Sequence, residues 1–261
     1  QLKNPISPEM SVMRESLLPG LILTAQRNIS RQQQRVRIFE VGRIFRGTLS
    51  KHLEIITISG LALGSVASEN WSDKKRSLDY YDIKGDIESL LNSTSKGISY
   101  SFVASQHPSL QVGQAADIFR EGKRIGMIGK LHPSIAKNFD LKVNVFIFEL
   151  NAEESFYSPI SKVQTISKFP YIRRDLSLVV DENITASELV NLIKEVEPEL
   201  VNEIIIFDIY RGKGVEEGRK SIALGLILQE KSRTLTDLDA DNIVKNVLVQ
   251  MKNKFSATLR E

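Results

Sequence analysis

Residues 204–212 constrain the fold more than any other part of the chain. They read Ile-Ile-Ile-Phe-Asp-Ile-Tyr-Arg-Gly, and this run of apolar, mostly β-branched residues predicts a β-strand. Side chains alternate between the faces of a strand, so one set is expected to face the core and the other to point away from it. The expected core set is Ile205, Phe207 and Ile209, and the opposite set is Ile206, Asp208 and Tyr210. An aromatic ring beside a hydrogen-bonding group on a sheet is typical of surfaces that hold an unpaired base. A half-exposed strand with an ordinary tyrosine is the alternative interpretation.

Two further segments, residues 174–181 and 221–229, show the same alternation. Each has one largely apolar face and one face of small or polar residues. Three such strands predict a sheet that is covered on one side only. Small residues on the other side leave room for a flat ligand; they are Ser177, Ser221, Ala223 and Gly225.

The order of elements predicts an α+β protein with two domains. From residue 167 the pattern is strand, helix, strand, strand, helix, short strand, which is the split βαβ arrangement of ferredoxin-like folds. Thr185 with Glu188 forms a capping box at the first helix, and Thr236 with Asp239 marks the start of the second. Before it, strands outnumber helices and short links join several of them, which favours an antiparallel sheet with helices packed on it. We expect a first domain at 1–155, a linker at 156–166 and a second domain at 167–261.

Composition narrows the class of protein. The 261 residues include no cysteine, which excludes disulfides and thiolate metal sites and indicates a reducing, cytoplasmic location. No apolar run reaches the length of a membrane span, and no signal peptide is visible. The chain begins at Gln1, which we interpret as a start inside a longer protein. Residues 1–164 carry 21 Lys and Arg against 16 Asp and Glu, whereas residues 165–261 carry 14 against 16. The second domain is therefore not a generally basic nucleic-acid binder.

The usual catalytic motifs are absent from the sequence. It has no phosphate-cradling loop with Lys-Ser/Thr, no Gly-x-Ser-x-Gly elbow and no His-Glu-x-x-His. The three histidines, His52, His107 and His132, lie far apart in sequence, so we expect no metal site. Nothing here assembles a nucleophile, a base and an oxyanion site.

Several segments, taken in order along the chain, resemble the β subunit of bacterial phenylalanyl-tRNA synthetase. Any one of these motifs is weak, but together they cover nearly the whole chain at the family's spacing. They lie at residues 11–21, 39–45, 81–88, 125–133, 169–180, 207–212, 220–221 and 233–236.

The resemblance implies that the first domain is like a class II synthetase core that no longer catalyses. In the family the working site lies on a separate α subunit, the assembly is an α₂β₂ heterotetramer, and the full enzyme uses ATP and Mg²⁺ to charge tRNA(Phe). The strand expected at residues 145–150 has neither arginine nor glycine, and we expect Phe146 and Phe148 to crowd it, so it is a poor ATP site. We therefore expect this chain to have no catalytic site and no cofactor of its own. In the family the editing site lies in the N-terminal portion, whose motifs are not visible in this sequence, so we also expect no editing site.

The second domain resembles the ferredoxin-fold anticodon-binding module of that family. The resemblance implies anticodon contacts by Asp208, Tyr210 and Ser221. Three arginines are weaker candidates for phosphate contacts: Arg173, Arg174 and Arg211. Two alternatives stay open, namely an amino-acid-sensing domain and a purely architectural module whose open face is covered by another subunit.

Overall fold

The structure is a computed structural model that describes residues 3–8, 11–48, 51–94, 98–157 and 166–260. The chain forms two compact units, residues 1–162 and 163–261, and each is described by itself. Residues 158–165 lie outside the described residues, so the limits expected for the linker stay a prediction. No helix in the described ranges is long and apolar enough to cross a bilayer.

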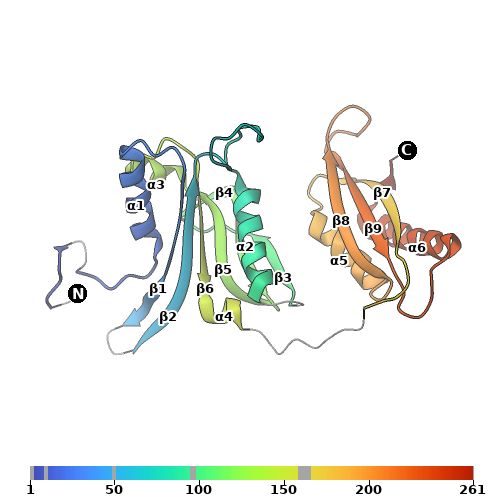
Figure 1. The fold of residues 1–261 in the computed structure, drawn as a ribbon, viewed down its shortest axis with the longest axis horizontal. Helices are drawn as coiled ribbons and strands as arrows, with labels where there is room; N and C mark the ends of the chain where they lie inside the picture. Colours follow the sequence, from blue (N-terminus) through green and yellow to red (C-terminus); the bar gives the residue numbers. More distant parts are fainter. Residues whose placement is uncertain (1–2, 9–10, 49–50, 95–97, 158–165, 261) are drawn as a thin grey trace. The chain divides into compact units, whose positions relative to one another are not determined.

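The N-terminal unit is built on a six-stranded antiparallel sheet with the order β1-β2-β6-β5-β4-β3. The strands are β1 Val36–Thr48, β2 Lys51–Leu63, β3 Tyr100–Ala104, β4 Leu110–Arg120, β5 Lys123–Leu131 and β6 Val145–Asn151. The helices are α1 Leu18–Ser30, α2 Tyr80–Thr94, α3 Pro133–Asn138 and α4 Ala152–Phe156. In Figure 1 the two longest of these helices, α1 and α2, flank the sheet.

Two hydrophobic clusters hold these helices on the sheet. Leu18, Leu21 and Ile22 of α1 pack with apolar side chains of β2, β5 and β6 such as Ile147. A separate cluster joins Ile83, Ile87 and Leu91 of α2 to side chains that include Phe146. Neighbouring residues of a strand point to opposite faces, so α1 and α2 cover opposite faces of the sheet.

The C-terminal unit is a four-stranded antiparallel sheet with two helices. Its elements are β7 Ile172–Asp181, α5 Ala186–Val196, β8 Val201–Tyr210, β9 Arg219–Leu228, α6 Asp237–Phe255 and β10 Thr258–Leu259. The strand order is β10-β7-β9-β8. This is the predicted βαββαβ arrangement, and the predicted α+β class is confirmed for the chain.

Both helices of this unit pack on the same face of its sheet. Side chains of α5 and α6 share one cluster with alternate residues of β7 and β9, among them the fully buried Ile222 and Leu224. In Figure 1 the helices lie together behind the sheet. The predicted capping box forms, because Thr185 exchanges hydrogen bonds with Glu188. The second helix starts after Thr236 as predicted, and Thr236 forms a capping box with Asp239. The opposite face of the sheet is left uncovered by helices among the described residues.

Candidate functional site

The uncovered face of the C-terminal sheet carries all three residues for which anticodon contacts were predicted. Residues directly opposite each other in an antiparallel pair point to the same face. Tyr210 pairs with Ser221, and Asp208 pairs with Ala223. Ser221 and Ala223 alternate with the buried Ile222 and therefore point away from the helices. Asp208, Tyr210 and Ser221 thus share the open face, as the alternation predicted.

Asp208 and Tyr210 differ in how they are held. The Asp208 carboxylate is exposed and has no hydrogen-bond or ion-pair partner among the described residues. The Tyr210 hydroxyl donates to the carbonyl of Lys213 at 3.2 Å. Gly212 has φ +150°, and a Cβ there would lie 3.0 Å from the Tyr210 hydroxyl oxygen. A glycine at this position therefore lets the loop after β8 close against the phenol.

Ser221 lies next to Tyr210 but is enclosed. It is 3% exposed, and its hydroxyl shares a hydrogen bond of 2.9 Å with the hydroxyl of Ser177 on β7. A ligand can reach Ser221 only where the side chains above it give way. Its predicted contact with a base or sugar stays a prediction.

Arg260 is a site residue that the sequence analysis missed. Its guanidinium lies 4.3 Å from the centre of the Tyr210 ring. The backbone N–H of Arg260 donates to the Ser177 carbonyl at 2.8 Å, which continues the pairing of β10 with β7. The Arg260 side chain, next to the edge strand β10, and the ring of Tyr210, on the edge strand β8, therefore meet over the sheet. A cation over an aromatic face is an attractive contact, and it places positive charge at Tyr210.

The three arginines proposed as phosphate contacts do not lie together. Arg173 is on the open face, where its Nε donates to Asp175 at 2.7 Å. Arg174 points to the helix side and pairs with Asp237 of α6 at 2.7 Å, and this hydrogen bond raises the arginine pKa. Arg211 follows β8 and contacts Glu182 at 2.7 Å, which lowers the carboxyl pKa of that glutamate. The structure thus separates Arg174 from Asp208 and Tyr210.

The simple alternation expected for β8 is wrong in its middle. Ile206 pairs with Leu224 and Asp208 pairs with the next residue of β9, so Phe207 is an extra residue in β8. Such a β-bulge shifts the alternation by one residue. Ile205 therefore lies on the open face opposite Gly225, and Ile206 lies on the helix side, each opposite to expectation. Phe207, expected in the core, is 50% exposed.

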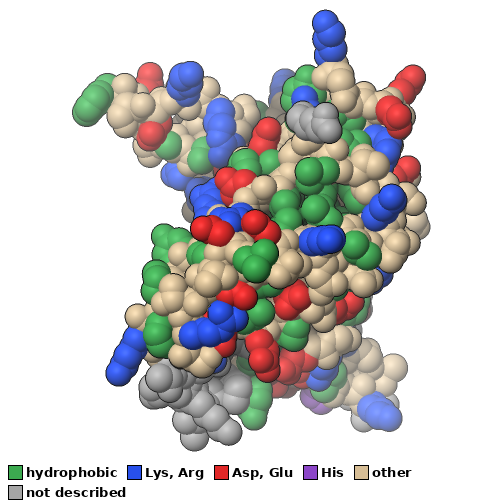
Figure 2. All heavy atoms as spheres, turned by 90° about the vertical axis from the view of Figure 1, so that its right-hand side faces the viewer, with side chains coloured by type: hydrophobic (Ala, Val, Ile, Leu, Met, Phe, Trp, Pro, Cys, Tyr) green, Lys and Arg blue, Asp and Glu red, His purple; other side chains and the backbone are tan. Residues whose placement is uncertain are grey.

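Charge over the molecule is mixed rather than uniformly basic. On the face drawn in Figure 2, Lys and Arg side chains are interspersed with Asp and Glu. Binding of a polyanion at the open face therefore depends on local cations such as Arg260 and Arg173.

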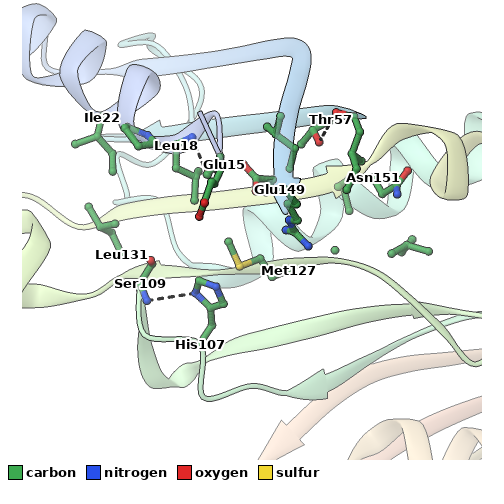
Figure 3. Close-up of a pocket in the computed structure, with 18 of the residues that line it drawn as sticks. Glu15, Leu18, Ile22, Thr57, His107, Ser109, Met127, Leu131, Glu149 and Asn151 are labelled. Atoms are coloured by element: carbon green, nitrogen blue, oxygen red, sulfur yellow. Dashed lines mark hydrogen bonds between the residues drawn. The ribbon is translucent and has the colours of Figure 1, made fainter. Parts of the chain in front are cut away.

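A second candidate site is a cleft of about 790 Å³ in the N-terminal unit. Figure 3 shows it between α1, which contributes Leu18 and Ile22, and the loop before β4, which contributes His107. Glu149 of β6 lies on the cleft and is only 8% exposed. Burial, with Arg124 nearby, lowers the pKa of His107.

The cleft corrects two expectations about β6. Phe146 and Phe148 pack on the α2 side of the sheet, so neither ring crowds the cleft. Among the residues that β6 contributes to the cleft is Glu149, whose carboxylate accepts from Ser16 Oγ at 2.8 Å and Leu17 N at 3.0 Å. The cleft also contains cations, because Arg46 and Arg124 line it. Arg124 is engaged by Asp117 at 2.6 Å.

Comparison with known families follows the same division of the chain. Residues 1–152 match the family described as phenylalanyl tRNA synthetase beta chain CLM domain. Residues 167–260 match the ferredoxin-fold anticodon binding domain. A class II-like domain followed by an anticodon-binding domain defines the class of the protein as an aminoacyl-tRNA synthetase subunit.

The chain belongs to the family of phenylalanine–tRNA ligase beta subunits. It is 39% identical over 260 residues to the beta subunit of Pseudomonas fluorescens, and 41% identical over 263 residues to that of Vibrio cholerae. Each alignment covers 100% of this chain and 33% of the relative, so the chain spans about a third of the length of these relatives. A pyrrolysyl tRNA synthetase structure from Desulfitobacterium hafniense aligns with a TM-score of 0.39 at 14% identity, over 54% of this chain and 47% of that one. That likeness is too weak to support an argument.

Proposed function

We propose that the open face of the C-terminal sheet binds the anticodon region of tRNA(Phe) in a cytoplasmic phenylalanine–tRNA ligase. The observation that carries this proposal is the placement of the exposed Asp208 and the half-buried Tyr210 on one uncovered sheet face, with the Arg260 guanidinium over the Tyr210 ring, in a domain that matches an anticodon-binding family. Tyr210 stacks on a base, Asp208 accepts a hydrogen bond from a base edge, and Ser221 hydrogen-bonds a base or sugar. Arg260 offsets the charge of the neighbouring phosphates.

The N-terminal unit has the role of assembly in this proposal. It contacts the α subunit in an α₂β₂ complex, and that complex uses ATP and Mg²⁺ to attach phenylalanine to tRNA(Phe). The chain itself forms no aminoacyl-adenylate, because β6 turns the Glu149 carboxylate toward the cleft and Asp117 engages Arg124, one of the two arginines that line it. Exchange of pyrophosphate into ATP that depends on phenylalanine, catalysed by the isolated chain above background, would contradict this part.

A filter-binding titration of tRNA(Phe) tests the anticodon site. Tyr210→Ala is expected to weaken binding by about 1–3 kcal/mol, the usual contribution of one stacked base. Ile209→Ala is the matched control, because Ile209 neighbours Tyr210 on the same strand and is 46% exposed, but pairs with the buried Ile222 on the other face. Equal affinities of Tyr210→Ala and Ile209→Ala for tRNA(Phe) would show that Tyr210 does not contact the RNA.

A change in the RNA separates anticodon binding from general RNA binding. A tRNA(Phe) with a substituted anticodon should bind the unaltered chain less tightly, and Tyr210→Ala should reduce that difference. If the substituted and natural tRNA bind equally well, the open face does not read the anticodon.

A further inference from the structure

The bulge in β8 turns an apolar ring onto the open face at a second position. Phe207 is the extra residue between Ile206 and Asp208 in the pairing with β9. The guanidinium of Arg173 lies 5.5 Å from the centre of the Phe207 ring. Arg173 pairs with Ile227, which alternates with the core residues Leu226 and Leu228, so Arg173 and the ring beside it lie on the side away from the helices. Bulges are enriched beside functional sites because they re-aim a side chain.

The sheet surface around Phe207 carries charged side chains that lie low, which leaves room for a nucleotide. The side chains of Arg173 and Asp175 form an ion pair at 2.7 Å. A Cβ on Gly225 would lie 3.1 Å from the Asp175 carboxylate and 3.2 Å from the Arg173 guanidinium. The glycine therefore lets this ion pair lie low against the sheet, beside the ring. The result is a half-exposed aromatic ring with a cation over it.

The distance between the rings of Phe207 and Tyr210 suits two separate nucleotides rather than one. Phe207 and Tyr210 are three residues apart, which is roughly 10 Å at about 3.3 Å per residue of strand. Stacked nucleotides advance by about 3.4 Å along one strand, so bases on these two rings are unstacked from each other. Four-stranded sheets of other RNA-binding proteins hold two or three splayed bases on exposed aromatic rings.

We propose that Phe207 is a second stacking platform, which holds a nucleotide of the same RNA beside the one held at Tyr210, with Arg173 contacting its phosphate. The proposal rests on the function proposed above, since it assigns a further base to the same RNA-binding face. The binding surface would then extend along β8 and hold two nucleotides, rather than form a single pocket.

The test uses the whole 261-residue chain and the anticodon stem–loop of tRNA(Phe). Phe207→Ala and Phe207→Leu are each expected to weaken binding by about 5- to 150-fold, the loss of one stacked base, whereas Phe207→Tyr retains affinity. Ile206→Ala is the matched control: it is the preceding residue, 41% exposed, and lies on the helix side of the strand. The control is expected to bind as the unaltered chain does. Circular dichroism confirms that each variant is folded before its affinity is compared.

A fluorescent adenine analogue, placed in turn at each loop position of the RNA, locates the two platforms. Binding should quench the probe at two positions, and Phe207→Ala should abolish quenching at one of them while Tyr210→Ala abolishes it at the other. If Tyr210→Ala weakens binding and Phe207→Ala does not, the second platform is refuted and the anticodon site stands. If Phe207→Leu binds as tightly as the unaltered chain, the ring does not stack a base and the proposal fails. If neither Tyr210→Ala nor Phe207→Ala has an effect, the function proposed for the whole face fails with it.

Discussion

At the scale of single residues, Glu149 is the carboxylate with the clearest structural role. The first turn of α1 contains no acidic residue, and Leu17 at its N-cap has no side chain that can accept from the helix. Glu149 supplies this acceptor from β6, because its Oε2 receives hydrogen bonds from Ser16 Oγ and Leu17 N. Helix N-termini leave backbone donors unsatisfied, and a carboxylate is favourable there. Glu149 therefore fastens the start of α1 to the sheet.

Removal of this carboxylate should be costly. Leu17 is 1% exposed, so Glu149→Ala leaves a buried N–H without a partner, which costs about 1–3 kcal/mol. Glu149→Gln should cost less, since its carbonyl oxygen still accepts one bond. Chemical denaturation followed by circular dichroism measures the loss, and hydrogen exchange should show lower protection over residues 15–25. Unchanged protection in Glu149→Ala would show that the hydrogen bonds do not hold the helix.

Sequence reasoning recovered the polar residues of the open face but not the cation above them. Asp208, Tyr210 and Ser221 could be grouped because strand periodicity alone assigns them to one face. Arg260 carries no local signal, since its contact with Tyr210 depends on the pairing of β10 with β7, at the other edge of the sheet. Arg174 was grouped with the site on charge alone, and its partners on α6 belong to a part of the chain more than 60 residues away.

At the scale of elements, β8 also shows that strand pairing cannot be read from the local sequence. Its apolar run predicts a strand correctly, yet the run Ile-Ile-Ile-Phe does not reveal where an extra residue enters the pairing. Periodicity assigns faces only where each residue has one partner, so the bulge inverts the assignment of Ile205 and Ile206. Helix starts were easier to predict, because a capping box is local: Thr185 and Thr236 cap α5 and α6 as expected.

The cap of α6 gives a prediction at this scale. Thr236 Oγ1 accepts from Asp239 N at 3.2 Å, and the Asp239 carboxylate accepts from Thr236 N at 2.9 Å and from Arg233 at 2.7 Å. Thr236→Ala should destabilise the C-terminal unit by about 0.5–2 kcal/mol. Thermal unfolding of the chain measures the change. Thr234→Ala, in the exposed loop before the helix, is the matched control and should leave the midpoint unchanged.

The same cap predicts a pH dependence. The hydrogen bond from Arg233, together with those from Thr236, lowers the pKa of Asp239 in the folded chain. The unfolded chain then binds the proton first as pH falls, so this carboxylate contributes stability above about pH 4 and the contribution is lost below it. Asp239→Asn should flatten the decline in stability of the C-terminal unit between about pH 5 and pH 2. An identical decline in the variant and the unaltered chain would contradict this role.

At the scale of the whole molecule, each unit has its own core. The cluster of the C-terminal unit runs from Leu176 to Ala257 and includes no residue of the N-terminal unit. A chain restricted to residues 166–261 should therefore fold alone and retain the RNA affinity of its open face. Circular dichroism and titration with the anticodon stem–loop check the two parts. A shortened chain that folds but does not bind would place the RNA contacts in the N-terminal unit.

Charge distribution predicts how salt affects RNA binding. The basic excess of the sequence lies in residues 1–164, whereas residues 165–261 carry two more acidic than basic residues. Under the proposed function, three arginines are expected to contact phosphates, although Arg173 and Arg211 also pair with carboxylates: Arg173, Arg211 and Arg260. For three phosphate contacts on single-stranded RNA, the slope of log K against log salt concentration is about −2. Titrations with the anticodon stem–loop at several salt concentrations should give a slope no steeper than this, and Arg260→Gln should make it shallower by about 0.7. A slope of about −4 or steeper would show that the basic N-terminal unit, and not base stacking on the open face, supplies most of the affinity.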